Sequence, residues 1–132
     1  MTTVITAAVL AARLIIALGF LPTAVAEDKN PSDPAPKAVQ IVVTAYSSSP
    51  DETDSTPFIT ASGKTTGDGI LANNCLPFGT EVKIPELFGE KIFVVEDRKH
   101  SRYSCNWLDV WYPTKAEAKK FGIKKEIEAL VF

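Results

Sequence analysis

The chain contains a series of short apolar runs with the two-residue period of β-strands, separated by turn residues such as Gly63, Gly67 and Gly69. Side chains that alternate in this way bury one face of a strand. The runs fall at residues 39–46, 69–72, 81–84, 91–97, 107–111 and 126–132. They predict a mostly β fold of about six short strands that closes as a small barrel.

Only one segment has the signals of a helix. Thr114 and Glu117 have the spacing of a capping box, and Gly122 follows at a distance that suits a helix end. We therefore expect one short helix between the last two strands. Residues 47–57 are rich in Ser, Asp, Thr and Pro without periodicity, which predicts a long surface loop, a common location for function.

The first 37 residues differ from the rest in composition. Residues 4–26 are apolar apart from threonines and Arg13 and end in small residues, as in a secretory signal peptide. Residues 27–37 carry three prolines and no large apolar side chain, which predicts an extended linker. We therefore expect a signal peptide over 1–26, a linker over 27–37 and one domain over 38–132, in a protein exported to the periplasm, cell wall or medium. An uncleaved membrane anchor is the alternative.

The charge of the chain argues against a nucleic-acid partner, because the formal net charge is −2. Basic residues cluster modestly at Arg98 to Arg102 and at Lys115 to Lys125, and we expect them on solvated faces, with an anion site as the alternative. His100 and two distant cysteines do not have the spacing of a metal site. We expect a monomer without a metal or a cofactor.

Cys75 and Cys105 are the only cysteines. An even count in a chain with export signals favours a disulfide, and two free thiols are the alternative. Closing a loop of about 30 residues would stabilise the fold by about 3–4 kcal/mol in the chain-entropy model.

Two aspartates, Asp97 and Asp109, end or interrupt β-type runs. A pair of carboxylates on neighbouring strands is the minimum equipment for acid–base chemistry on a glycosidic bond. In a strand over 107–111, Asp109 shares one face with Trp107 and Trp111, which offer stacking surfaces to a sugar ring. The alternative for Asp109 is a structural ion pair with Arg98, Lys99 or Arg102, and Asp97 is equally compatible with a plain salt bridge.

Several short motifs follow one another from Val39 to the C-terminus. They are Thr44-Ala45-Tyr46, Thr60-Ala61-Ser62-Gly63, Leu76-Pro77-Phe78-Gly79-Thr80, Glu96-Asp97-Arg98, Leu108-Asp109-Val110 and a helix with Ala116, Ala118 and Phe121-Gly122. In this order and spacing they resemble the 3D domain, a bacterial cell-wall module named for three aspartates. That domain is related to the catalytic domain of membrane-bound lytic transglycosylase A, to rare-lipoprotein-A-like proteins and to expansins. The resemblance implies a six-stranded double-psi β-barrel with one short helix.

The resemblance also implies roles for individual residues. Asp109 is the counterpart of the catalytic acid, and Asp97 is the second aspartate of the same groove. The first aspartate is replaced at Asn73-Asn74, where we assign Asn74 as the substitute, and the family's Asp-Thr-Gly-Gly turn is also replaced. The expected substrate-binding residues are Asn74, Tyr46, Thr60, Trp107 and Trp111, whereas His100 is expected to be a loop residue without a catalytic role.

The resemblance predicts a lytic transglycosylase that acts on peptidoglycan or a related polysaccharide. Such an enzyme cleaves the bond between N-acetylmuramic acid (MurNAc) and N-acetylglucosamine (GlcNAc) without water, with Asp109 as acid and then base. An inverting hydrolase would need a second carboxylate to activate water. The alternatives are a non-catalytic module that binds or loosens wall polysaccharide, as expansins do, and an envelope protein whose barrel only supports protein contacts.

Overall fold

The computed structural model describes residues 33–132. The expected signal peptide, its membrane-anchor alternative and most of the expected linker lie outside the described residues. The first strand begins at Lys37, the last residue of the expected linker. No helix within residues 33–132 has the length and apolar character needed to cross a bilayer.

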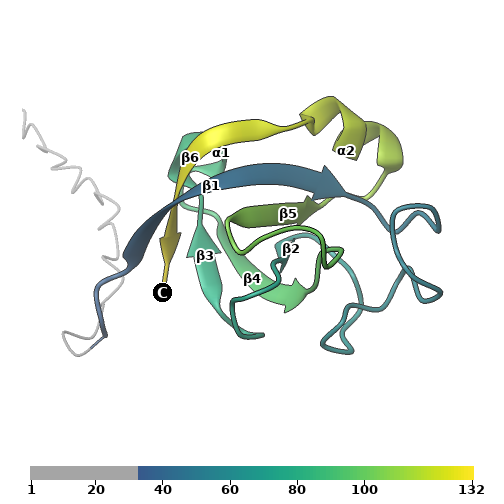
Figure 1. The fold of residues 1–132 in the computed structure, drawn as a ribbon, viewed down its shortest axis with the longest axis horizontal. Helices are drawn as coiled ribbons and strands as arrows, with labels where there is room; N and C mark the ends of the chain where they lie inside the picture. Colours follow the sequence, from purple (N-terminus) through teal and green to yellow (C-terminus); the bar gives the residue numbers. More distant parts are fainter. Residues whose placement is uncertain (1–32) are drawn as a thin grey trace, which may run out of the picture. The chain divides into compact units, whose positions relative to one another are not determined.

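The described residues form a closed β-barrel of six strands with little helix (Figure 1). The order around the barrel is β1-β5-β2-β4-β3-β6. The strands are β1 (Lys37–Tyr46), β2 (Ile70–Ala72), β3 (Glu81–Lys83), β4 (Ile92–Asp97), β5 (Trp107–Trp111) and β6 (Lys124–Val131). All six predicted strands are present, with ends that differ by one or two residues.

Two of the six strand pairings are parallel and four are antiparallel. Strand β1 pairs in parallel with β5, and β2 pairs in parallel with β4. Strand β6 runs antiparallel to both β1 and β3 and closes the barrel. Strands distant in sequence are therefore neighbours, and the loops that follow β1 and β4 reach one groove, described below.

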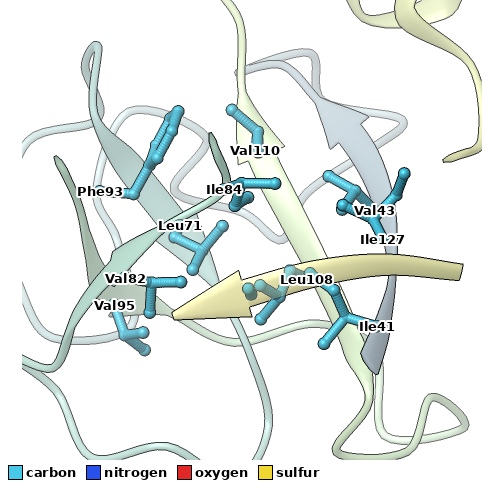
Figure 2. Close-up of a cluster of buried hydrophobic side chains, with 11 residues drawn as sticks. Ile41, Val43, Leu71, Val82, Ile84, Phe93, Val95, Leu108, Val110 and Ile127 are labelled. Carbon is cyan, nitrogen blue, oxygen red and sulfur yellow. The ribbon is translucent and has the colours of Figure 1, made fainter. Parts of the chain in front are cut away.

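The interior is filled by side chains from all six strands (Figure 2). The predicted alternation holds in β5, where Leu108 and Val110 are buried in the core, and in β3, where Val82 is completely buried. Phe93 is the largest fully buried side chain and packs edge-on against Phe88. The core cluster consists of Ile41, Val43, Leu71, Val82, Ile84, Phe93, Val95, Leu108, Val110, Ile127 and Ala129.

The structure has two helices where one was predicted. Helix α2 (Lys115–Phe121) has the expected cap, because Thr114 Oγ1 accepts a hydrogen bond from the Glu117 amide at 3.2 Å and Gly122 follows with a φ of 69°. Helix α1 (Pro85–Phe88) falls in a segment for which the sequence predicted no helix. Pro85 comes two residues after the end of β3, and its fixed φ suits the first turn of a helix.

Candidate functional site

The two aspartates lie at one level of the barrel, in a row that crosses four strands. Thr44 of β1 is the register partner of Asp109 of β5. Ala72 of β2 is the register partner of both Asp109 and Asp97 of β4. The sequence suggested that the two aspartates lie on neighbouring strands. In the structure they do not, because β2 lies between their strands. The residue of β2 at that point is alanine, whose small side chain leaves space between the two carboxylates.

Asp109 is buried and has two polar partners, one hydroxyl group and one ammonium group. Its Oδ1 accepts a hydrogen bond from Thr44 Oγ1 at 2.8 Å, and its Oδ2 lies 2.6 Å from Lys99 Nζ. The Lys99 ammonium also donates to Thr44 Oγ1 at 3.0 Å, which closes a triangle of three polar groups. The side chains of Lys99 and Asp109 are 9% and 10% exposed, so this ion pair is largely shielded from solvent. The structural ion pair considered for Asp109 is thus present, and its partner is Lys99.

Asp97 is held by three donors. Tyr46 Oη donates to Oδ2 at 2.7 Å, and the amides of Ala61 and Arg98 donate to Oδ1 at 3.0 and 2.9 Å. Burial, and then the negative charge of Asp97, raise the pKa of Tyr46 well above its ordinary value. Tyr46 therefore stays a neutral phenol that donates to Asp97. These bonds fix the Asp97 carboxylate and leave it little freedom to act as a base.

A polar groove of about 700 Å³ connects the two carboxylates. A cavity of this size accommodates a small ligand. Tyr46, Ala72, Asp97 and Asp109 line it from the strands. Two loops supply most of the remaining lining: the acidic loop (residues 47–58), which follows β1, and the basic loop (residues 98–106), which joins β4 to β5. Ile59, directly after the acidic loop, also lines the groove.

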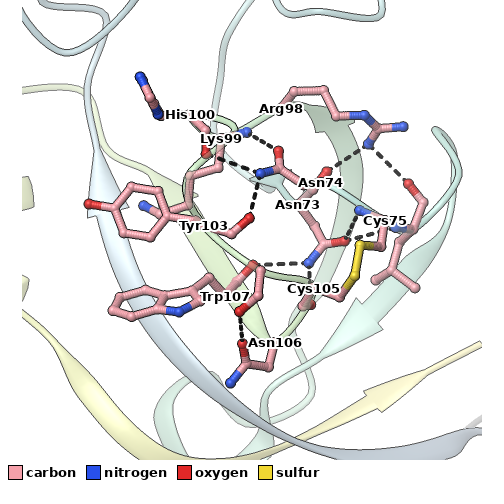
Figure 3. The surroundings of a disulfide bond; sticks show 12 residues. Asn73, Asn74, Cys75, Arg98, Lys99, His100, Tyr103, Cys105, Asn106 and Trp107 are labelled. Atoms are coloured by element: carbon pink, nitrogen blue, oxygen red, sulfur yellow. Dashed lines mark hydrogen bonds between the residues drawn. A yellow bond between two sulfur atoms is a disulfide. The ribbon is translucent and has the colours of Figure 1, made fainter.

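Asn74 braces the basic loop instead of lining the groove (Figure 3). Its Nδ2 donates to the carbonyls of His100 and Tyr103 at 3.2 and 2.9 Å. Its Oδ1 accepts from the Lys99 amide at 2.9 Å. The residue assigned in place of the first family aspartate therefore positions the backbone that carries Lys99. An aspartate at this position would have no Nδ2 donors for the two carbonyls.

Asn73 and the disulfide anchor the far end of the basic loop. Asn73 is fully buried, and its Nδ2 donates to the carbonyls of Cys105 and Trp107 at 2.8 and 2.9 Å. Its Oδ1 accepts from the amides of Cys75 and Leu76. The predicted disulfide between Cys75 and Cys105 is confirmed, with a Cα–Cα distance of 5.3 Å. The segments around residues 73–76 and 105–107 are thus joined by two hydrogen bonds and one covalent bond.

Besides Asn74, three expected substrate-binding residues do not line the groove. Thr60 is buried in a turn, where its Oγ1 accepts from the Lys64 amide at 3.0 Å. Trp107 packs against Tyr103 with ring centroids 5.0 Å apart, and Trp111 donates from Nε1 to Ser48 Oγ at 3.0 Å. Tyr46 is the one expected substrate-binding residue that lines the groove.

Sequence reasoning missed the role of Thr44, which contacts Asp109 directly. It predicted residues 47–57 as a loop of a kind that commonly carries function but named no site residue in it, whereas residues 51–54 line the groove. Thr44 belongs to the first motif of the resemblance, but only the parallel register of β1 and β5 shows that it faces Asp109.

A second hollow of about 280 Å³ lies beside the disulfide. Its lining includes Val39, Ile41, Leu76 and Leu108, and Lys37 is its only charged residue. Because it contains no carboxylate or nucleophile, we place the candidate chemistry in the polar groove.

In comparisons with known proteins, no family model and no curated protein matched this chain.

Proposed function

We propose that this is an exported cell-envelope protein whose polar groove binds the glycan strand of peptidoglycan, and that Asp109 cleaves the MurNAc–GlcNAc bond as a lytic transglycosylase. The observation that carries the proposal is the placement of Asp109, a buried carboxyl that lines the groove beside a hydroxyl and an ammonium. The disulfide supports export, because such bonds persist in oxidising compartments.

The proposed reaction needs one carboxyl group in two protonation states. The protonated Asp109 gives its proton to the glycosidic oxygen while the bond from that oxygen to C1 of MurNAc breaks. The resulting carboxylate takes the proton of the C6 hydroxyl as that oxygen bonds to C1, which closes a 1,6-anhydro ring and restores the acid. No water is consumed. Asp97 is engaged by three donors, so it suits positioning better than the activation of water that a hydrolase needs.

The second candidate function is binding of wall glycan without cleavage, and the contact between Lys99 and Asp109 favours it. Lys99 Nζ lies 2.6 Å from Asp109 Oδ2, and Thr44 Oγ1 donates to Oδ1 at 2.8 Å, so both carboxyl oxygens are occupied by partners within the protein. Cleavage therefore requires that Lys99 leaves Asp109 Oδ2 when glycan enters the groove.

Product analysis distinguishes the two functions. The purified protein is incubated with peptidoglycan, and the released muropeptides are analysed by mass. A lytic transglycosylase releases 1,6-anhydro products, and Asp109→Asn abolishes them, whereas Asp97→Asn lowers the yield less. The matched control is Asp68→Asn, which removes another carboxylate that pairs with a lysine at 2.6 Å but does not line the groove.

Two results would contradict the enzymatic proposal. Glycan binding by the wild-type protein without any anhydro product would leave the binding function alone. Undiminished product from a folded Asp109→Asn protein would show that another group is the acid.

A further inference from the structure

The four basic side chains of residues 98–102 have different partners. The Arg98 guanidinium donates to the carbonyls of Asn73 and Leu76 at 2.7 and 3.0 Å, so it holds the backbone together. Lys99 pairs with Asp109. The His100 Nδ1 accepts from the Arg102 amide at 3.2 Å. Within residues 33–132, no carboxylate forms an ion pair with Arg102, although this residue lines the groove.

Arg102 is held in place by an aromatic side chain. Its guanidinium carbon lies 4.9 Å from the centroid of the Tyr103 ring, and Nη2 donates to Tyr103 Oη at 3.0 Å. The Lys99 ammonium lies 4.3 Å from the centroid of the same ring. Tyr103 therefore contacts both Arg102 and the lysine that pairs with Asp109. A guanidinium fixed by a ring retains donors for a planar anion such as a carboxylate.

The acidic loop gives another part of the groove a negative charge, opposite to that of the basic loop. Asp51 pairs with Lys115, Glu52 accepts from Ser47, and Asp54 accepts from the Thr56 amide and hydroxyl. These carboxylates line the groove and disfavour an anionic group near them. An anionic ligand is thereby directed to the basic loop.

We propose that Arg102, positioned by Tyr103, is a carboxylate-binding subsite that selects the MurNAc side of the glycan. The inference rests on the proposed function and names the feature of the substrate that the groove recognises. Of the two sugars, only MurNAc carries a lactyl ether, whose carboxyl is either free or joined to a stem peptide with carboxylates of its own. GlcNAc has no anionic group for Arg102 to bind.

The test compares anionic and neutral glycans of the same length. Affinities are measured in the Asp109→Asn protein, where the proposed cleavage cannot consume the ligand. The probes are peptide-free strands of alternating GlcNAc and MurNAc, strands that retain the stem peptide, and neutral GlcNAc oligomers. Arg102→Gln should weaken binding of the MurNAc-containing strands about tenfold and change the affinity for the neutral oligomers by less than about twofold. Arg102→Lys should recover part of the loss, since it keeps the charge but not the planar fork.

The matched control is Lys125→Gln, which removes one positive charge from an exposed position of β6 that does not line the groove. If Arg102→Gln loses affinity for peptide-free strands alone, the anion bound by Arg102 is the lactyl carboxylate. If it loses affinity for peptide-bearing strands alone, the anion is a stem-peptide carboxylate. Equal losses on charged and neutral glycans, or no loss from Arg102→Gln, would overturn the subsite. Absence of binding to every glycan by the parent protein would instead overturn the proposed function.

Discussion

The barrel interior and the rim of the groove are stabilised by different kinds of interaction. The interior is a cluster of apolar side chains that depends on burial and close packing. The rim depends on individual atoms: the amides of Asn73 and Asn74, one disulfide, and the contact between Lys99 and Asp109. The interior therefore determines whether the barrel forms, whereas the rim determines the shape of the groove.

The largest effect is expected in the interior. Phe93→Ala should lower the free energy of unfolding by about 3–5 kcal/mol, because it removes the largest fully buried side chain and leaves a cavity. Urea denaturation measures the change. The control is the neighbouring Ile92→Ala, which alters a side chain that is 46% exposed and should cost less than about 1 kcal/mol. Equal effects at the two positions would show that close packing of the interior is not the main source of stability.

Removal of the disulfide tests how far the rim contributes to global stability. The double variant Cys75→Ser, Cys105→Ser opens a link across a sequence separation of 30 residues. The expected loss is about 3–4 kcal/mol, since the unfolded chain regains loop-closure entropy. Thermal and urea unfolding under non-reducing conditions measure it. An unchanged stability would mean that the hydrogen bonds of Asn73 alone hold the two segments.

A double-mutant cycle measures the contact between Lys99 and Asp109. Lys99→Met and Asp109→Asn each leave a shielded polar group without its partner, so each should destabilise the protein. The double variant should lose about 1–3 kcal/mol less unfolding free energy than the sum of the two single losses. Unfolding free energies of the four proteins give this coupling. Additive losses would show that the pair does not stabilise the rim.

The smallest effect is expected for Glu96, a buried side chain of β4 that pairs with the exposed Lys64. The hydrogen bond from Lys64 lowers the pKa of the Glu96 carboxyl most, and the hydrogen bond from Ser62 lowers it further. A lowered folded-state pKa adds stability that is fully present above the unfolded-state pKa and is lost as the pH falls through the folded-state value. Wild-type protein should therefore lose more stability than Glu96→Gln on acidification from neutral pH. Parallel pH profiles would contradict this assignment.

Local patterns in the sequence predicted much of the fold. The two-residue alternation located all six strands, and the capping box located α2. The pairing of Cys75 with Cys105 followed from the even cysteine count and the export signals. Helix α1 was missed because a single turn is too short to show a helical period and because Pro85 marks both a strand end and a helix start.

The candidate site was predicted less completely, because its contacts join distant parts of the chain. Thr44, Lys99 and Asp109 meet only when β1 and β5 pair in register. The period of β5 correctly separated Trp107 and Trp111 from the core side chains. A shared face does not mean a shared level, because side chains two residues apart lie about 7 Å apart along a strand. The two indoles therefore have partners at other levels of the barrel.

The pairing of β1 has a consequence for the order in which the barrel assembles. Both neighbours of this first strand, β5 and β6, come from the last third of the sequence. Until residues 107–111 have been synthesised, β1 has neither of its native hydrogen-bonding partners, and it gains the second only with residues 124–131. Contacts of such long sequence separation form slowly, because loop closure precedes them. The barrel therefore cannot close until the segment that carries β5 and β6 has been made and can pair with β1.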